Sequence, residues 1–205
     1  NYADNNPGVL NSIVKKKLRL EILREEQFKN LTDTDSPQGI VAVFRFGKRQ
    51  VNPNELYDDK MIIYLDNISD PGNVGTILRT ADWFGVKNIL LSPGCVELYN
   101  PKVLRSSMGS IFHLNLIERF DVEKLNGFVD KQFSLICTDL YGKNLYEYNF
   151  PEHFVLIFSN EANGPSVEIH NSTKERITIP KFGKAESLNV GGAFAVVMSY
   201  VKGKV

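Results

Sequence analysis

Residues 179–200 read IPKFGKAESLNVGGAFAVVMSY, and this stretch joins three segments of different character. A β-rich run ends at Ile179, and residues 181–187 are polar. Residues 188–200 are almost wholly apolar, and their Gly and Ala residues give the expected helix a small cross-section. A helix that is apolar on every side is buried, and this segment is too short for a bilayer, which needs about 20 apolar residues. We expect a buried helix packed on more than one side, with the polar loop held at a rim of the fold. The stretch alone also fits a buried C-terminal helix preceded by an ordinary surface loop.

Length and composition are those of an ordinary globular protein, one α/β domain or one domain plus a fragment of another. The chain has 205 residues, 42% of them hydrophobic, and a formal net charge of zero. The chain as a whole is therefore not strongly basic, as many nucleic-acid-binding proteins are. A local basic patch is still possible. The two cysteines, Cys95 and Cys137, and the three histidines lack metal-ligand spacing, so we expect free thiols, no metal and a reducing, cytoplasmic location. No signal peptide or membrane span is visible, and we expect no membrane partner.

Strand and helix patterns alternate along most of the chain. The turn-rich segment at residues 32–37 suggests a domain boundary near residue 35, and apolar spacing over residues 9–30 predicts a helix, or a helix followed by a strand. The alternation beyond it predicts an α/β fold with a mostly parallel sheet and helices on both faces. Expected strands cover residues 39–46, 61–65, 88–91, 111–117, 133–138, 154–158 and 176–179; expected helices begin near residues 73, 101, 121, 165 and 188.

Three polar loops follow expected strands, at residues 66–73, 159–166 and 181–187. Ligands of open parallel sheets bind beyond the carboxyl ends of the strands, so these loops are expected to meet at one rim if their strands are neighbours. No GxGxxG follows a strand, which argues against dinucleotide binding. No Ser–His–Asp or Cys–His set is evident either, so hydrolysis by a nucleophilic side chain has little support.

Five polar side chains on these loops are candidates for chemistry, and each also has a plain structural interpretation. Asn73 stands at a helix N-terminus, where backbone N–H groups favour an anion. Arg79 follows an apolar pair and is expected near the buried stripe, where an unpaired charge is costly. Glu161 either orients Arg79 or caps the next helix. Ser187 and Asn189 either cap the apolar helix or point into the rim.

Together these segments resemble the SpoU family of RNA ribose methyltransferases, within the SPOUT superfamily. Their order and spacing match the family over residues 36–201. The matching segments are SPQGIVAV at 36–43, LDNISDPGNVGTILRTADWFGV at 65–86, RSSMGSIFHL at 105–114, LIFSNEANGPS at 156–166 and IPKFGKAESLNVGGAFAVV at 179–197.

The resemblance implies a SPOUT catalytic domain over residues 36–205, with its C-terminus threaded into a deep trefoil knot, a feature otherwise nearly absent from proteins. It implies that residues 1–35 are the tail and linker of an N-terminal, ribosomal-protein-like RNA-binding domain. It further implies S-adenosylmethionine (SAM) as methyl donor, RNA as partner, and a homodimer built partly on the last helix. The implied reaction methylates a ribose 2′-hydroxyl, with ribosomal RNA preferred. The alternatives are a transfer-RNA ribose methyltransferase, a base methyltransferase and a non-catalytic RNA-binding relative.

Site residues are carried over from the family motifs position by position. Arg79 is interpreted as a phosphate binder and stabiliser of the developing alkoxide, held by Glu161, because a guanidinium stays protonated and makes a poor base. Ser159 and Ala162 stand where the family usually has Gly, and each adds a Cβ beside the cofactor loop. Val201 stands where Glu is frequent. The functional polar positions are Asn73, Arg79, Glu161, Ser187 and Asn189; the SAM positions are Ser159, Asn160, Gly164, Ile179 and Leu188, with Thr138 and Asp139 as weaker candidates.

Overall fold

The structure is a computed structural model that describes every residue except 1, 33–35, 44, 46–55, 161–162 and 205. The chain divides into two compact units, residues 1–49 and residues 50–205. The assignment of residues 1–35 to an RNA-binding tail, and of the remainder to a catalytic domain, stays a prediction.

The first unit contains three short helices, α1 (Tyr2–Asn5), α2 (Pro7–Lys15) and α3 (Glu25–Lys29). They replace the continuous helix, or helix and strand, expected over residues 9–30, and residues 39–43 are irregular where a strand was expected. Many large apolar side chains of this unit remain exposed. Most of the stability of a helix in a protein comes from packing its apolar face. The three helices of this unit have little to pack against, and they are correspondingly short.

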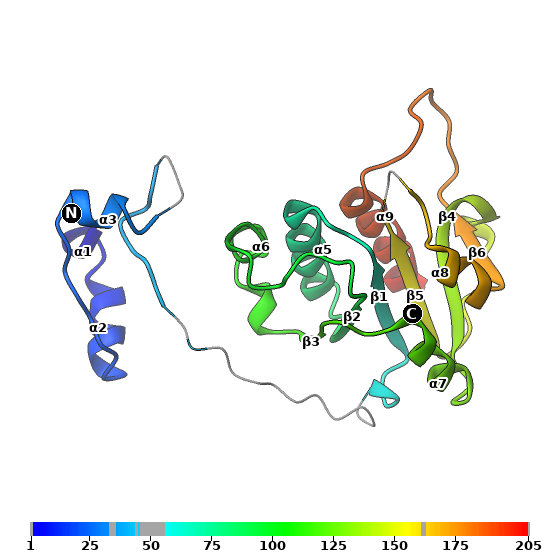
Figure 1. Ribbon diagram of the computed structural model, residues 1–205, viewed down its shortest axis with the longest axis horizontal. Helices are drawn as coiled ribbons and strands as arrows, with labels where there is room; N and C mark the ends of the chain where they lie inside the picture. The colour runs from blue at the N-terminus through cyan, green and yellow to red at the C-terminus, as the bar shows by residue number, and fades with distance from the viewer. Residues whose placement is uncertain (1, 33–35, 44, 46–55, 161–162, 205) are drawn as a thin grey trace. The chain divides into compact units, whose positions relative to one another are not determined.

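The second unit is built on a six-stranded sheet of order β3-β2-β1-β5-β4-β6, whose strand pairings are all parallel (Figure 1). This confirms the expected α/β fold with a mostly parallel sheet. The strands are β1 (Met61–Asp66), β2 (Asn88–Leu91), β3 (Asn115–Ile117), β4 (Ser134–Asn144), β5 (Phe154–Ser159) and β6 (Glu175–Thr178). The helices are α5 (Pro71–Trp83), α6 (Pro101–Ser106), α7 (Asn126–Val129), α8 (Val167–Ser172) and α9 (Val190–Lys204).

Helices cover both faces of this sheet, as predicted. Alternate side chains of β1 point to opposite faces, so Ile63 and Leu65 pack with α5, α6 and α9, whereas Ile62 and Tyr64 pack with α7 and α8. All four side chains are fully buried. Parallel strands covered on both faces carry such continuous apolar runs, which is why the short run MIIYL was readable as a strand.

Two expected elements differ from the structure. Residues 111–117 form a 3-10 turn and the three-residue strand β3, which pairs only with β2 among the described strands. Residues 121–132 form a 3-10 turn that runs into the four-residue helix α7. Asp121 does not cap this helix, because its carboxylate instead accepts from Lys124 Nζ at 2.6 Å.

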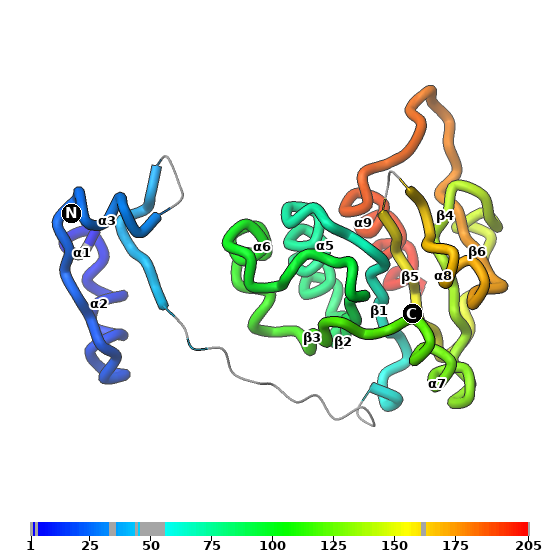
Figure 2. The backbone as a smooth tube through the Cα atoms, viewed as in Figure 1, coloured from blue at the N-terminus to red at the C-terminus, as the bar shows by residue number. Residues whose placement is uncertain are grey.

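The last segment returns from the edge of the sheet to its middle. After β6 the loop at residues 180–189 leads to α9, which packs beside α5 and against β5 (Figure 2). Phe194, Val197 and Met198 are buried, but Gly192 and Ser199 are exposed, so the expectation of a helix buried all round is wrong for the single chain. The trefoil knot stays a prediction with which this path is consistent. Within the described residues, no helix is long and apolar enough to cross a membrane.

Candidate functional site

A cavity of about 520 Å³ lies at the carboxyl ends of β4, β5 and β6. Leu145, Phe158 and Ile177 contribute apolar side chains to it, together with Val190, Ala193 and Val197 of α9. Most of the remaining wall is formed by residues 159, 160 and 163–165, at the end of β5 and beyond it, and by residues 178–183 and 185–188, at the end of β6 and beyond it. Cavities of about 300–1,000 Å³ with mostly apolar linings and a few convergent polar groups are typical small-molecule sites.

The structure brings most of the predicted site residues to this cavity. All seven residues expected at SAM line it: Thr138, Asp139, Ser159, Asn160, Gly164, Ile179 and Leu188. Ser187 also lines it, whereas Asn73, Arg79 and Asn189 do not. Asn189 nevertheless stands between two lining residues, Leu188 and Val190, and so lies at the rim. Glu161 and Ala162 lie outside the described residues.

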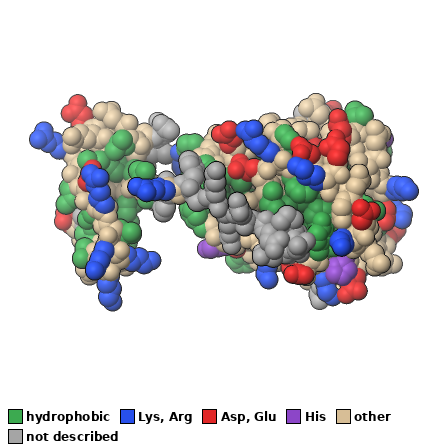
Figure 3. All heavy atoms as spheres, turned by 60° about the horizontal axis from the view of Figure 1, so that its bottom comes forward, with side chains coloured by type: hydrophobic (Ala, Val, Ile, Leu, Met, Phe, Trp, Pro, Cys, Tyr) green, Lys and Arg blue, Asp and Glu red, His purple; other side chains and the backbone are tan. Residues whose placement is uncertain are grey.

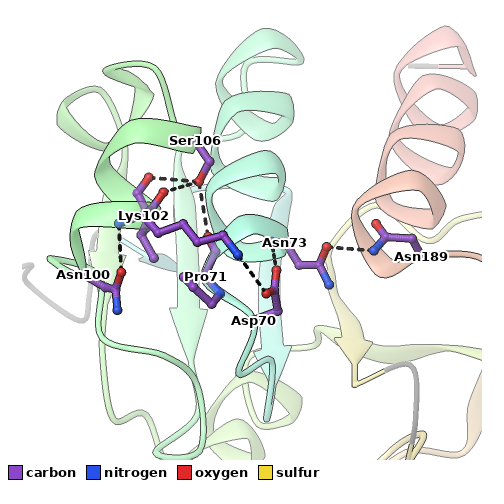
Figure 4. A network of polar contacts seen from close by, with 8 residues as sticks. Asp70, Pro71, Asn73, Asn100, Lys102, Ser106 and Asn189 are labelled. Carbon is purple, nitrogen blue, oxygen red and sulfur yellow. Dashed lines mark hydrogen bonds and ion pairs between the residues drawn. The ribbon is translucent and has the colours of Figure 1, made fainter. Parts of the chain in front are cut away.

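Asn189 joins the N-termini of α5 and α9 (Figure 4). Its Nδ2 donates to Asn73 Oδ1 at 2.8 Å, and its Oδ1 accepts from the N–H groups of Gly191 and Gly192 at 3.0 and 3.4 Å. Asn189, and not Ser187, is therefore the residue that caps α9. Both halves of one amide are used, so this side chain fixes the helix start and Asn73 together.

Asp70 fixes the backbone of Asn73 at the start of α5. Its carboxylate accepts from Asn73 N–H at 2.8 Å and lies 3.4 Å from Lys102 Nζ (Figure 4). The Asn73 N–H, with a further contribution from Lys102, lowers the pKa of Asp70. Asp70 and Asn189 thus hold Asn73 from its two ends, which pre-orients its amide at the rim.

Asn189→Asp is expected to separate the capping role from the contact with Asn73. An aspartate still accepts from the first N–H groups of α9, so the melting temperature should stay within a few degrees of wild type. It cannot donate to Asn73 Oδ1, so the methyl transfer that the family resemblance implies should fall by about tenfold or more. Asn189→Ala, the comparison variant, should lower both activity and melting temperature. Thermal melts and turnover measured on the same preparations check this, and full activity in Asn189→Asp would contradict the role of the contact.

Arg79 is exposed, and the expectation that it lies against the buried stripe is wrong. It shares the outer face of α5 with Thr76 and Trp83, while Leu78 and Ala81 face the core. Its side chain makes no hydrogen bond or ion pair with any residue that the structure describes. It lies six residues, about 9 Å, beyond Asn73 along the helix axis. The guanidinium is therefore available to an anion from outside the chain.

Ser159 does not fill the cavity with its side chain. Phe158 packs its ring against Phe194 at 4.8 Å on the cavity side, so strand alternation turns Ser159 toward the opposite face, where it lies beside Cys137. The Ser159 hydroxyl is buried without an ordinary hydrogen-bond partner among the described residues. Burial is the main cause that raises the pKa of Cys137 to about 12. Ser159 thus lines the cavity through its backbone, and its Cβ leaves the space open.

The two weaker candidates are already bonded within the protein. Thr138 Oγ1 donates to the Ile157 carbonyl at 2.9 Å. The Asp139 carboxylate accepts from Leu140 N–H at 2.6 Å and from Arg176 Nη1 at 3.1 Å, in a largely buried ion pair. Both residues shape the wall of the cavity, and neither presents an unused polar group to it.

The continuation of β4 past Thr138 was missed in the sequence. The expected strand ended at residue 138, whereas β4 runs to Asn144 and brings Leu140 to the cavity. Gly142 is what permits this strand, because a Cβ there would lie 2.7 Å from the Arg176 carbonyl group. A glycine inside a strand often marks such a close approach of two backbones, and this was the usable signal.

Positive charge is distributed over the second unit without forming a single field on the face shown in Figure 3, where basic and acidic side chains are interspersed. Arg105 is exposed close to α5, and Lys102 is paired with Asp70. A polyanion would therefore bind to individual exposed cations of this unit, because the unit has no overall positive charge to attract it.

The parallel sheet, the cavity at its strand ends and the joined starts of α5 and α9 are an α/β arrangement shared with solved structures of SpoU-type methyltransferases. Residues 60–199 match the SpoU rRNA Methylase family, and the chain belongs to that family. The resemblance predicted from the five matching segments is thereby confirmed.

Several known proteins are similar to the chain. It is 31% identical to the Bacillus subtilis 23S rRNA (guanosine(2553)-2′-O)-methyltransferase, over 96% of this chain and 82% of that protein. It is 26% identical to the Streptomyces viridochromogenes 23S rRNA (uridine(2479)-2′-O)-methyltransferase, over 80% and 60%. Among solved structures, an AdoMet-bound rRNA methyltransferase from Sinorhizobium meliloti shares 27% identity at a TM-score of 0.74, over 89% of this chain and 70% of that one.

Proposed function

We propose that this protein transfers a methyl group from SAM to a ribose 2′-hydroxyl of ribosomal RNA. The observation that carries the proposal is the cavity, which is lined by every residue that the family motifs predict for SAM, with the Asn73–Asn189 pair at its rim. Similar proteins named as 23S rRNA 2′-O-methyltransferases, and a similar structure with AdoMet bound, support it.

The cavity suits SAM in size and in chemistry. Leu145, Phe158 and Ile177 supply apolar surface, and polar residues of the surrounding loops, among them Asn160, Asn163 and Ser187, supply donors and acceptors. The Ser159 side chain, turned to the other face of the sheet, leaves this volume available. When bound, SAM supplies a methyl group activated by a sulfonium leaving group.

The chain's own residues then have to orient the RNA and stabilise charge. Asn73 presents its fixed amide to the ribose or its phosphate. Arg79 binds an adjacent phosphate and stabilises negative charge developing on the ribose oxygen, a use that suits a permanently protonated group. Glu161 stays the predicted partner of Arg79. Ser187, on the wall of the cavity, is assigned to the contact between the rim loops.

The direct test combines a binding and a transfer measurement. Calorimetry with SAM should show binding, and radiolabelled SAM should methylate ribosomal RNA from cells that lack the gene. Mass spectrometry of the digested RNA should then find a 2′-O-methylated nucleoside. Absence of SAM binding would favour the non-catalytic relative, label on a base would favour a base methyltransferase, and label confined to transfer RNA would favour that substrate.

The proposal includes a homodimer formed through the open face of α5 and α9. Gly192, Ala195 and Ser199 make one side of α9 thin, and Trp83 on the exposed face of α5 is 85% exposed. Small side chains let helices approach closely, and a large exposed aromatic side chain is enriched at protein interfaces. These features support a second copy as the partner of this face.

Ala195→Glu is expected to convert the dimer into a monomer of about the chain mass, 23.2 kDa. A carboxylate placed between packed helices loses its hydration without gaining a partner. Light scattering after gel filtration gives the mass. Asn171→Glu is the matched control, because it adds the same charge to α8, on the opposite face of the sheet. A dimer that survives Ala195→Glu would exclude this face.

A further inference from the structure

Asp66 is a buried carboxylate that none of the proposed roles uses. It is the last residue of β1, only 1% exposed, and it stands opposite Ser159 in the pairing of β1 with β5. Its Oδ2 accepts from Ser166 N–H at 2.8 Å, and its Oδ1 accepts from Asn67 Nδ2 at 3.0 Å. Ser166 caps α8 and ends the loop that follows β5. Asp66 therefore holds the far end of that loop on β1.

The neighbouring residue, Asn67, holds the other end. Its carbonyl oxygen accepts from Asn160 Nδ2 at 3.2 Å. Asn67 is itself fixed, since its N–H donates to Ser92 Oγ at 2.9 Å and its backbone adopts a φ of 54°, a left-handed conformation that Asn tolerates. The turn after β1 is thus tied to β2 on one side. On the other side it carries both ends of the loop at residues 160–166.

A charged carboxylate at this depth is retained only with well-placed donors, because an unpaired buried charge costs several kcal/mol. The two donors to Asp66 come from different segments and approach different oxygens. An asparagine at this position has one acceptor oxygen, and its NH₂ group would face a second donor. A carboxylate at this position accepts both bonds at once, one on each oxygen.

We infer that Asp66 is a positioning residue for the cofactor loop. Through Ser166, and together with Asn67 and Asn160, it fixes the two ends of the loop at residues 160–166. That loop supplies Asn160, Asn163, Gly164 and Pro165 to the cavity wall and contains Glu161. The identity of the ligand as SAM rests on the proposed function, whereas the anchoring itself is a property of the chain without ligand.

The first test compares Asp66→Asn with Asn88→Ala. Asn88 is equally buried but begins β2 at the opposite end of the sheet, where it bonds Asp59 and Asn115 and no cavity loop. In Asp66→Asn, amide hydrogen exchange at Asn160, Gly164 and Ser166 in the ligand-free protein should accelerate about tenfold or more, and the Kd for SAM should rise by a similar factor. Asn88→Ala should lower the melting temperature but leave loop exchange and the Kd within about twofold of wild type.

A second pair isolates the bond itself without changing the buried acid. Ser166→Pro removes the N–H that donates to Asp66, and the φ of −59° at this position suits proline. Ser166→Ala removes the same capping hydroxyl but keeps the N–H. Faster loop exchange and weaker SAM binding in Ser166→Pro, relative to Ser166→Ala, would support the inference even where Asp66→Asn fails to fold.

Equal loop exchange in the two Ser166 variants would overturn it and leave Asp66 a purely structural residue. Failure of the proposed function looks different. In that case the wild-type protein itself shows no heat with SAM, while the exchange comparison in ligand-free protein still decides whether Asp66 anchors the loop.

Discussion

Replacing Arg79 with alanine is expected to abolish methyl transfer while leaving SAM binding at wild-type affinity. Arg79 is exposed, unpaired among the described residues and outside the cavity, so its removal changes neither the core nor the SAM site. Loss of a group that stabilises charge in the transition state costs about 10²–10³-fold in rate. Single-turnover methylation of RNA, measured beside calorimetry with SAM, separates the two effects.

Two further variants sharpen this prediction. Arg79→Lys keeps the positive charge but loses the planar fork that binds phosphate through two parallel bonds, so it should restore only part of the rate. Lys87→Ala removes an exposed cation just before β2, at the end of the sheet away from the cavity, and should retain full activity. A wild-type rate in Arg79→Ala would show that the group near the reacting oxygen is a different one.

The parts of the fold that were predictable are those whose cause is local. The runs MIIYL and NILL are buried on both faces and read as parallel strands. The helix expected to begin near residue 73 is α5, which begins at Pro71 after the capping residue Asp70. The cofactor residues were carried over from the family motifs, and the strand pattern independently predicted that the polar loops after the strands lie on the ligand side of the sheet.

The parts that could not be predicted depend on residues far apart in the sequence. The partner of Asp66 lies 100 residues away, so nothing in the segment DNISDPG shows that its first residue is a loop anchor. The exposure of Arg79 depends on which sides of α5 are covered by α6 and α9. The strand at Gly142 depends on the approach of the backbone at Arg176. In each case the deciding contact is tertiary.

Enlarging Ala193 to leucine is expected to remove SAM binding without unfolding the protein. Ala193 lies on the cavity side of α9, one turn before Val197, and both residues line the cavity. Added methyl groups normally strain a packed core, but here they enter existing space and gain apolar contacts, so the melting temperature should not fall. The same bulk takes volume from the ligand, and the Kd for SAM should rise by about 100-fold or more, at a cost of about 2.7 kcal/mol.

Gly203→Leu provides the control for this change. It adds an apolar side chain to the same helix, at an exposed position where a Cβ meets nothing within 4 Å. SAM affinity in this variant should equal that of wild type. If Ala193→Leu also bound SAM normally while remaining folded, the cavity between α9 and the ends of β4–β6 would not be the SAM site. The assignment of the seven SAM residues would then fail as well. It rests on their shared position around this cavity and not on any single side-chain contact.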